Sequence, residues 1–312
     1  NVICLGHILD KDGKKMSKSV GNVVDPWEMM DKYGVDTLRL WMYSVNQPGE
    51  SKNFDEKTVS ELNNKVFNLF YNVLAFYELY RDKSIEDREY KKSDNILDQW
   101  IIARLNKLVL DMTNSMDNYK LLEPVRGIRE FVDELSTWYV RRSRERIKDG
   151  DVDVKQTLYF VLKTFSKILA PFAPFAAEDI WQKLKNTSDA ESVHLAEWPE
   201  GGKVNEDLIS EMQIVRHVVT LGLEARQKAN IKVRQPLSEL KVKSYQLKDE
   251  YIEIIKDELN IKAVVYDDSI ENPVELDSHI TLDLKKEGQY RELVRAIQDM
   301  RKKEGLNPND VI

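Results

Sequence analysis

Cysteine is nearly absent from this sequence, and long apolar runs are absent altogether. A single cysteine, Cys4, allows no internal disulfide and no zinc site built from several cysteines, and it suits a reducing cytosol. The longest apolar candidate, residues 168–177, is shorter than the ~20 residues that a membrane-spanning helix needs, and Pro171 and Pro174 interrupt it. We therefore expect a cytoplasmic, globular protein with no metal-ligand set and no membrane partner.

Positive charge is also in short supply, because 47 lysines and arginines face 54 aspartates and glutamates, for a formal net charge of -7. This balance argues against general affinity for nucleic acid, so any RNA contact has to come from a local basic surface. Residues 226–243 carry a net charge of +5 and include Lys232 and Arg234, whereas residues 245–277 carry -7. The first segment is suited to phosphate contact and the second would be repelled by phosphates.

The hydrophobic pattern predicts a mainly α-helical protein. The chain has 312 residues, 42% of them hydrophobic, which is enough for two or three domains with cores of their own. Between residues 53 and 200 apolar residues recur every three or four positions, as they do in helices that pack on one another. The predicted core faces are Leu62, Val66, Leu69, Phe70, Val73, Leu74 and Tyr77; Ile101, Leu105, Leu108 and Met112; Ile128, Phe131, Leu135 and Trp138; and Leu158, Val161, Leu162, Phe165, Ile168 and Leu169. We predict a helix bundle for this region.

After Gly201-Gly202 the pattern changes to a mixture of helix and strand. Apolar periodicity, alternation and turn residues predict the elements in order. They are a helix at 208–229, a strand at 237–242, a helix at 250–259, strands at 263–266 and 280–284, and a helix at 290–303 closed by Gly305. Residues 201–312 should therefore form a small α+β domain.

Residues 15–19, Lys15-Met16-Ser17-Lys18-Ser19, carry the most specific chemical signal. Runs that favour strand, Val2–Leu5 and His7–Leu9, lead into an Asp-Gly turn, and residues 25–28, Asp-Pro-Trp-Glu, mark a helix start. The five residues should thus lie on a loop between a strand and a helix. Ammonium groups on such a loop can stabilise charge on a departing phosphate, and the serines add hydroxyl donors. An ordinary solvated basic turn is the alternative interpretation.

This string resembles the KMSKS signature of the class I aminoacyl-tRNA synthetases at all five positions, with the usual Gly21-Asn22 after it. Further matches extend over nearly the whole chain, at residues 22–28, 31–36, 138–144, 193–199, 231–237 and 297–302. Among class I enzymes the pattern is similar to that of the isoleucyl enzymes. The valyl enzymes resemble it closely but usually lack Trp27, and selectivity for valine stays open as an alternative because the amino-acid pocket is not in this chain.

The family's second phosphate-binding signature, His-x-Gly-His, is missing. None of the four histidines fits it: His7, His194, His217 and His279. Because Asn1 is not a plausible native start, we expect a carboxy-terminal fragment that opens just before the KMSKS loop. The resemblance implies three parts: residues 1–52 as the end of a Rossmann-type catalytic domain, 53–200 as an α-helical anticodon-binding bundle, and 201–312 as the α+β domain.

The resemblance also implies a reaction for the full enzyme, which is ATP-dependent activation of isoleucine to the adenylate and transfer to tRNA(Ile), with Mg²⁺ accompanying ATP. Lys18 is then expected to contact the transition-state phosphate and Lys15 to support it. Met16, Ser17 and Ser19 complete the expected ATP contacts. We expect a monomer, and a fragment that is inactive alone because ATP and isoleucine act through the missing domain. A non-catalytic tRNA-binding module is the rival interpretation, whereas a purely structural helical protein would leave the loop unexplained.

A second candidate site is an arginine cluster, where Arg141, Arg142, Arg144 and Arg146 fall within six residues. Helical spacing places Arg142 and Arg146 on one face, and Arg141, Arg144 and Lys148 on another. One interpretation is structural, with the cations complementing a helix C-terminus and bridging to neighbouring helices. The other is RNA contact, in which arginines hold the backbone and stack on splayed bases. Both stay open, and Lys232 and Arg234 are further candidates for tRNA contact.

Overall fold

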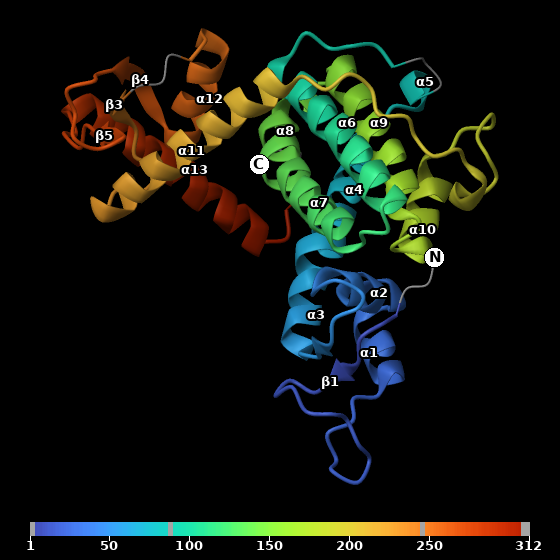
Figure 1. Cartoon of the computed structure of the whole chain (residues 1–312). Coiled ribbons are helices and arrows are strands. Elements are labelled where there is room, and N and C mark those ends of the chain that lie inside the picture. The colour runs from blue at the N-terminus through green and yellow to red at the C-terminus, as the bar shows by residue number, and fades with distance from the viewer. Residues whose placement is uncertain (1–3, 87–89, 244–246, 307–312) are drawn as a thin grey trace. The chain divides into compact units, whose positions relative to one another are not determined.

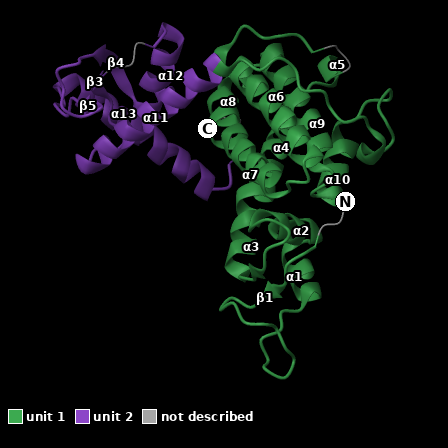
Figure 2. Ribbon diagram, in the orientation of Figure 1, with its two compact units in different colours: residues 1–206 green, residues 207–312 purple. Residues whose placement is uncertain are grey.

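Helices make up most of the molecule, as the sequence predicts, and they fall into two compact units, residues 1–206 and 207–312 (Figures 1 and 2). The structure is a computed structural model that describes residues 4–86, 90–243 and 247–306. Val2 and Ile3, part of the first predicted strand, lie outside the described residues.

The first segment of unit 1 is a parallel strand pair with helices in the crossover. Its elements are β1 (Ile8–Leu9), α1 (Pro26–Tyr33), α2 (Val35–Ser44) and β2 (Lys52–Asn53). Ile8 lies opposite Lys52 in the register. Parallel strands joined by helices are the connection expected at the end of a Rossmann-type sheet. The predicted helix start is confirmed, because the Asp25 carboxylate accepts the Trp27 N–H at 2.8 Å and Pro26 occupies the first helical position.

The rest of unit 1 is the predicted helix bundle. Its elements are α3 (Glu56–Leu62), η1 (Asn63–Asn68), α4 (Leu69–Tyr80), α5 (Lys83–Glu86), α6 (Ile96–Asp117), α7 (Leu122–Asp133), η2 (Glu134–Val140), α8 (Arg141–Lys148), α9 (Val152–Leu169), α10 (Pro174–Leu184) and η3 (Val193–Leu195). Figure 1 shows α4, α6, α7, α8 and α9 gathered side by side. Phe165 of α9 stacks on Phe70 of α4 and Phe131 of α7, with ring centroids 4.8 and 5.5 Å apart. Three of the predicted apolar faces therefore meet in one core.

Within η2 the aromatic side chain that enters this core is not the predicted one. The sequence spacing predicts Trp138 as the continuation of the third apolar face, but Tyr139 is fully buried and Trp138 is half-buried. Tyr139 follows Leu135 by four positions, a spacing that keeps a helix face as well as the three positions to Trp138 do, and both residues lie within the π-helical η2. The prediction for Trp138 is wrong because spacing alone does not decide between the two residues, while Ile128, Phe131 and Leu135 are buried as predicted.

Unit 2 is an α+β structure built on one small sheet. Its elements are α11 (Glu206–Lys228), β3 (Leu237–Val242), α12 (Asp249–Leu259), β4 (Ile261–Tyr266), β5 (Val274–Leu276) and α13 (Leu282–Lys303). The strand order is β4-β3-β5, with β4 parallel and β5 antiparallel to the central β3. Tyr251, Ile255 and Leu259 of α12 are buried in the core of this unit.

One predicted strand of unit 2 is wrong. Residues 280–284 do not form a strand, because the Thr281 hydroxyl accepts the Leu284 N–H at 3.3 Å and starts α13 eight residues before the predicted helix start at Tyr290. The third strand is β5 instead, which the sequence pattern missed because its three residues are too short to show alternation. A Thr cap followed by Asp283 is a helix-start signal that outweighs the short apolar run.

A buried carboxylate ties the long helix of the bundle to its neighbours. Asp98 of α6 is completely buried and accepts hydrogen bonds from both terminal nitrogens of Arg146, at 3.0 and 2.8 Å. It also accepts from the hydroxyls of Tyr139 at 2.9 Å and Ser93 at 2.7 Å. Four donors from three different segments therefore converge on one carboxylate, which satisfies its hydrogen-bonding capacity and offsets the cost of burying its charge.

Asp98→Ala should destabilise the chain by about 3–5 kcal/mol, because it leaves the half-buried Arg146 guanidinium without its main partner. The free energy of unfolding from urea denaturation followed by circular dichroism measures the effect. Asp111→Ala is the matched control on the same helix; its carboxylate is 65% exposed and lies 3.8 Å from Lys107, so the destabilisation should stay below about 1 kcal/mol. Equal destabilisation in the two variants would contradict the role of Asp98.

Candidate functional site

The KMSKS loop, residues 10–25 between β1 and α1, is closed at its base by one carboxylate. Asp10 accepts the backbone N–H groups of Asp12 at 3.0 Å and Lys14 at 2.8 Å, and the side-chain amide of Asn22 at 2.7 Å. The pKa of the Asp10 carboxyl lies below its ordinary value, chiefly because Asn22 donates to it and further because Lys14 does. These hydrogen bonds favour the ionised carboxylate, so this contribution to loop order is lost as the pH falls through that lowered pKa.

Asn22 links the two ends of the loop to the signature residues. Its amide group donates to Asp10 and to the carbonyl oxygen of Lys15 at 3.2 Å, and its amide oxygen accepts the Ser17 N–H at 2.8 Å. A single side chain therefore fixes the backbone on both sides of Met16. The family pattern includes Asn22, but neither its role nor that of Asp10 follows from sequence spacing; the Asp12-Gly13 turn beside Asp10 is the one signal for it in the sequence.

The two lysines of the signature extend from this ordered backbone into solvent. Lys15 and Lys18 are exposed, and within the described residues neither ammonium group has a carboxylate partner. The Ser17 and Ser19 hydroxyls lie 2.8 Å apart. Beyond them the chain turns back at Gly21, whose φ of 76° favours glycine and lets its N–H reach the Ser17 carbonyl oxygen at 3.1 Å. The loop therefore presents two cations and two hydroxyls on a short, hydrogen-bonded turn.

Met16 faces the apolar interior of this segment. It lines a cavity of about 390 Å³ whose walls are nearly all apolar. The other lining residues are Ile8, Val24, Pro26, Met29, Met30, Leu38, Trp41, Met42 and Phe54. Methionine fills irregular spaces well, so Met16 anchors the loop without forcing one rigid packing.

The arginine cluster divides into a core residue and surface residues. Arg146 binds Asp98 and also donates to Asp151 at 2.8 Å, so its guanidinium is committed to the bundle. Arg141 and Arg144 are exposed. Arg142 is half-buried. The structural interpretation therefore holds for Arg146, and the exposed arginines are the ones that present charge to the outside.

Each exposed arginine lies over an aromatic ring. Arg141 lies 5.9 Å from the Trp138 ring centroid and donates to the Thr137 carbonyl oxygen at 2.7 Å. Arg144 lies 5.2 Å from the ring centroid of Phe76 on α4. Guanidinium planes held over aromatic rings keep their charge while losing side-chain freedom, which suits stacking on a nucleic-acid base.

In unit 2 the basic segment 226–243 is less exposed than its charge suggests. Arg226 is almost fully buried and donates to the backbone carbonyl oxygens of Lys232 at 3.1 Å, Gln235 at 3.0 Å and Asn260 at 3.0 Å. Burial lowers the pKa of this guanidinium to about 10. Arg226 therefore shapes the loop that carries Lys232 and Arg234 and is not part of its surface charge.

Lys232 and Arg234 share one acidic neighbour. Glu292 of α13 lies 4.0 Å from the Lys232 ammonium and 3.5 Å from the Arg234 guanidinium. The Lys232 side chain is 79% exposed. One carboxylate facing two cations leaves a net positive charge on this loop.

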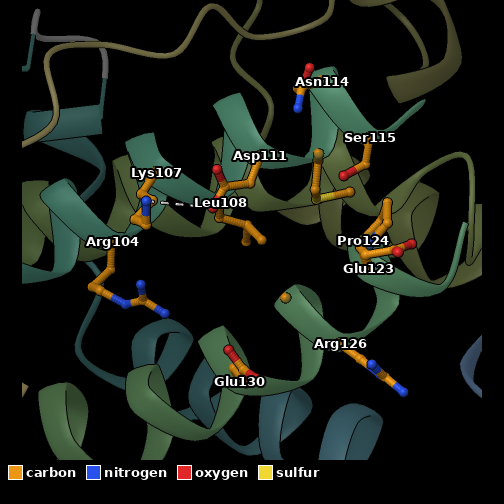
Figure 3. Close-up of a pocket in the computed structure, with 12 residues that line it drawn as sticks. Arg104, Lys107, Leu108, Asp111, Asn114, Ser115, Glu123, Pro124, Arg126 and Glu130 are labelled. Carbon is orange, nitrogen blue, oxygen red and sulfur yellow. Dashed lines mark ion pairs between the residues drawn. The ribbon is translucent and has the colours of Figure 1, made fainter. Parts of the chain in front are cut away.

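A second cavity of about 400 Å³ opens between α6 and α7 (Figure 3). Figure 3 shows Arg104, Lys107 and Arg126 along it. Asp111, Glu123 and Glu130 line the same space and match those cations in number. The cavity therefore has no excess charge that would select an anion or a cation.

The part of the chain that the structure describes contains no group of three or more His, Cys, Asp or Glu side chains placed to hold a metal ion. None of the helices in that part is long and apolar enough to cross a membrane.

Comparison with known proteins gives the family. Residues 1–55 match the family model of class I tRNA synthetases (I, L, M and V), and residues 98–243 match that of the anticodon-binding domain of tRNA ligase. The chain is 42% identical to the isoleucine–tRNA ligase of Clostridium novyi (strain NT), covering 96% of this chain and 30% of that protein. The chain belongs to the isoleucine–tRNA ligase family. It is also 40% identical to the ligase of Clostridium tetani (strain Massachusetts / E88), over 95% of this chain and 30% of the relative.

The resemblance to the isoleucyl enzymes is thus confirmed, and the valyl alternative is not favoured. The chain spans about 30% of the length of the curated isoleucine–tRNA ligases that it matches. A solved ternary complex of Agrobacterium radiobacter K84 agnB2 LeuRS with tRNA and LeuAMS has a TM-score of 0.48 and 22% identity, over 66% of this chain and 24% of that one.

Asn22→Ala should loosen the KMSKS loop of this ligase segment without unfolding the rest. Trypsin should cleave at the loop lysines faster, and the pKa of the Asp10 carboxyl should rise toward its ordinary value because its main hydrogen-bond donor is gone. Timed proteolysis with mass spectrometry and an NMR titration of the carboxyl carbon measure the two effects. Asn72→Ala, at an exposed asparagine of α4, should change neither; an unchanged cleavage rate in Asn22→Ala would show that the loop is ordered by other contacts.

Proposed function

We propose that this chain supplies the KMSKS phosphate loop and the tRNA-binding region of an isoleucine–tRNA ligase. The observation that carries the proposal is the complete Lys15–Ser19 loop, held at its base by Asp10 and Asn22, with two ammonium groups that have no carboxylate partner within the described residues. The reaction is ATP-dependent activation of isoleucine to the adenylate, followed by transfer to tRNA(Ile). Its amino-acid pocket belongs to the part of the ligase outside this chain.

In this proposal the loop acts on the phosphates of ATP. Lys18 contacts the phosphate on which negative charge develops as pyrophosphate leaves, and Lys15 supports it electrostatically. The backbone at Met16 and Ser17, together with the Ser19 hydroxyl, completes the ATP contact. Mg²⁺ accompanies the ATP as part of the substrate and needs no ligand from these residues. Because Asn22 already orders the loop backbone, the cations are preorganised for the charge that appears.

The bundle and unit 2 hold the tRNA. Arg141 and Arg144, each placed over an aromatic ring, are suited to phosphates and unstacked bases, with Arg142 beside them. Lys232 and Arg234 add a second positive surface. Arg146 is withdrawn from the tRNA contacts because it is bound to Asp98. The division proposed is 1–52 for the end of the catalytic domain, 53–200 for the anticodon-binding bundle and 201–312 for the α+β domain, in a monomeric cytoplasmic enzyme.

Lys18→Ala in the full-length ligase should slow adenylate formation about a hundredfold or more, because one preorganised charge is worth roughly 3–4 kcal/mol of barrier. Isoleucine-dependent ATP–pyrophosphate exchange measures the rate, and filter binding should show nearly unchanged tRNA affinity. Lys57→Ala, at an exposed lysine of α3 outside the loop, is the matched control and should exchange normally. A decrease below about tenfold in the Lys18 variant would remove Lys18 from the phosphate site.

Replacing Arg141 and Arg144 together by alanine should weaken binding of tRNA(Ile) and make it less dependent on salt. For every phosphate that is no longer bound, the slope of log K against log salt should fall by about one. Binding titrations at several salt concentrations measure both quantities. Arg126→Ala, at an exposed arginine of α7, is the control. Equal weakening of tRNA binding in the two variants would mean that the affinity arises from charge alone and not from the α8 surface.

A further inference from the structure

At the corner between α9 and α10, the N-terminus of α10 has no side-chain cap from the residue that precedes it. α10 begins at Pro174, and the preceding residue, Ala173, has no side chain that could accept a hydrogen bond from the first turn. The missing acceptor comes from α2, where Asp36 Oδ2 accepts the Ala176 N–H at 2.6 Å across 140 positions of sequence. A helix N-terminus that needs an acceptor is thus capped by a helix of the KMSKS segment.

The same helix supplies the opposite charge to the other side of the corner. Arg39, one turn after Asp36, donates from Nη2 to the Pro171 carbonyl oxygen at 3.3 Å, just past the C-terminal end of α9. A carboxylate at a helix N-terminus and a guanidinium at a helix C-terminus both match the helix dipoles. Tyr43, a turn further on, meets Phe172 edge to face with ring centroids 5.9 Å apart. Side chains of α2 therefore contact both the N-terminus of α10 and the segment just after the C-terminus of α9.

The Asp36 side of this fit is buried, whereas the hydrogen bond from Arg39 to Pro171 is exposed. Asp36 is only 7% exposed, and burial raises the pKa of its carboxyl despite the hydrogen bond from Ala176. A buried charge of this kind persists where a fixed dipole or donor meets it. If α2 only had to pack against the bundle, apolar side chains would be sufficient at positions 36 and 39 and no buried charge would be needed.

On its other side α2 is part of the KMSKS segment. Trp41 of α2 lines the same apolar cavity as Met16 of the loop, and its indole N–H donates to the Thr58 hydroxyl at 2.8 Å. α1 packs beside it, with the Tyr33 hydroxyl donating to Glu56 at 2.9 Å. α2 therefore lines the cavity that holds the Met16 side chain and also contacts the α9–α10 corner.

We propose that Asp36 and Arg39 are positioning residues that set the KMSKS loop in register with the tRNA-holding bundle by clamping α2 onto the two helix ends at the α9–α10 corner. The inference rests on the proposed function and extends it to the step that needs both sites, the transfer of the aminoacyl group to bound tRNA. Activation of isoleucine uses the loop together with the amino-acid pocket outside this chain, and tRNA binding uses the surfaces of the bundle and unit 2. Neither step needs the loop to be held in register with the bundle, so neither depends on the clamp. Transfer depends on both, since small misplacement of reacting groups is enough to slow a reaction.

The test uses the full-length ligase with Asp36→Ala and Arg39→Ala combined. Aminoacylation kcat should fall about tenfold or more, while pyrophosphate exchange and the tRNA Kd stay within about twofold of the wild type. The single variant Asp36→Asn, with Arg39 unchanged, should keep most of the wild-type transfer rate, because the amide oxygen of the new side chain can still accept the Ala176 N–H. If the double variant does not fold, as judged by its melting temperature, Arg39→Gln carries the same expectation.

A charge exchange separates the clamp from a simple ion pair. Asp36→Arg combined with Arg39→Asp should transfer as slowly as the double alanine variant, because each side chain then faces the helix end that repels it. Recovery of transfer would show that the two residues serve each other and would overturn the proposal. Asp31→Ala, an exposed acidic residue of α1, is the matched control and should behave as wild type.

The outcome also separates this proposal from the one on which it rests. A wild-type enzyme without isoleucine-dependent exchange would refute the proposed function itself. A wild-type enzyme that exchanges, with a clamp variant in which exchange and transfer decrease in equal proportion, would leave the function intact and show that Asp36 and Arg39 are merely structural.

Discussion

The arrangement of the bundle depends on one buried carboxylate, Asp98. Because it receives both terminal nitrogens of Arg146 and two hydroxyls, it fixes the rotation of α8 about its own axis. With Arg146 turned inward, Arg141 and Arg144, which lie elsewhere around the helix, are directed outward. An apolar contact at position 98 would allow several rotations of similar energy, whereas a bidentate pair allows one. The specificity of this polar contact therefore decides which cations reach the surface.

The KMSKS loop follows a different principle, because its order is local. Asp10, Asn22 and the turn at Gly21 close it with hydrogen bonds between residues no more than 12 positions apart. Those bonds are solvent-exposed or half-buried, so each contributes little to global stability. Such a loop can stay ordered in its backbone and still change its position as a body about its ends, which suits the phosphate contact proposed for it.

Much of the fold can be predicted from the sequence because helical periodicity is a strong local signal. The strand at Leu237–Val242 matches the structure, and the helix predicted over 250–259 begins one residue earlier. Predictions failed where a local pattern gives no sign of a non-local event. Spacings of three and four residues both keep a helix face, so the pattern alone does not decide between Trp138 and Tyr139, and β5 is defined by its partner β3 and not by its three residues. In the loop, the motif predicts the two lysines. The hydrogen bonds of Asp10 and Asn22 that close the loop depend on geometry that sequence spacing does not contain.

Charge counts along a chain are a poor guide to RNA affinity, and the cations of this protein show why. Arg146 and Arg226 belong to basic clusters in the sequence, yet one is bound to Asp98 and the other to three backbone carbonyls. The charge of Arg146 is neutralised by Asp98, and the Arg226 guanidinium is buried where no phosphate can contact it, so neither arginine offers a cation at the surface. The exposed arginines of α8, Arg141 and Arg144, lie over aromatic rings, which hold a guanidinium in place at the surface. A protein with a net charge of -7 can thus present a positive surface where it is needed, because pairing and burial, more than the number of lysines and arginines, determine the local field.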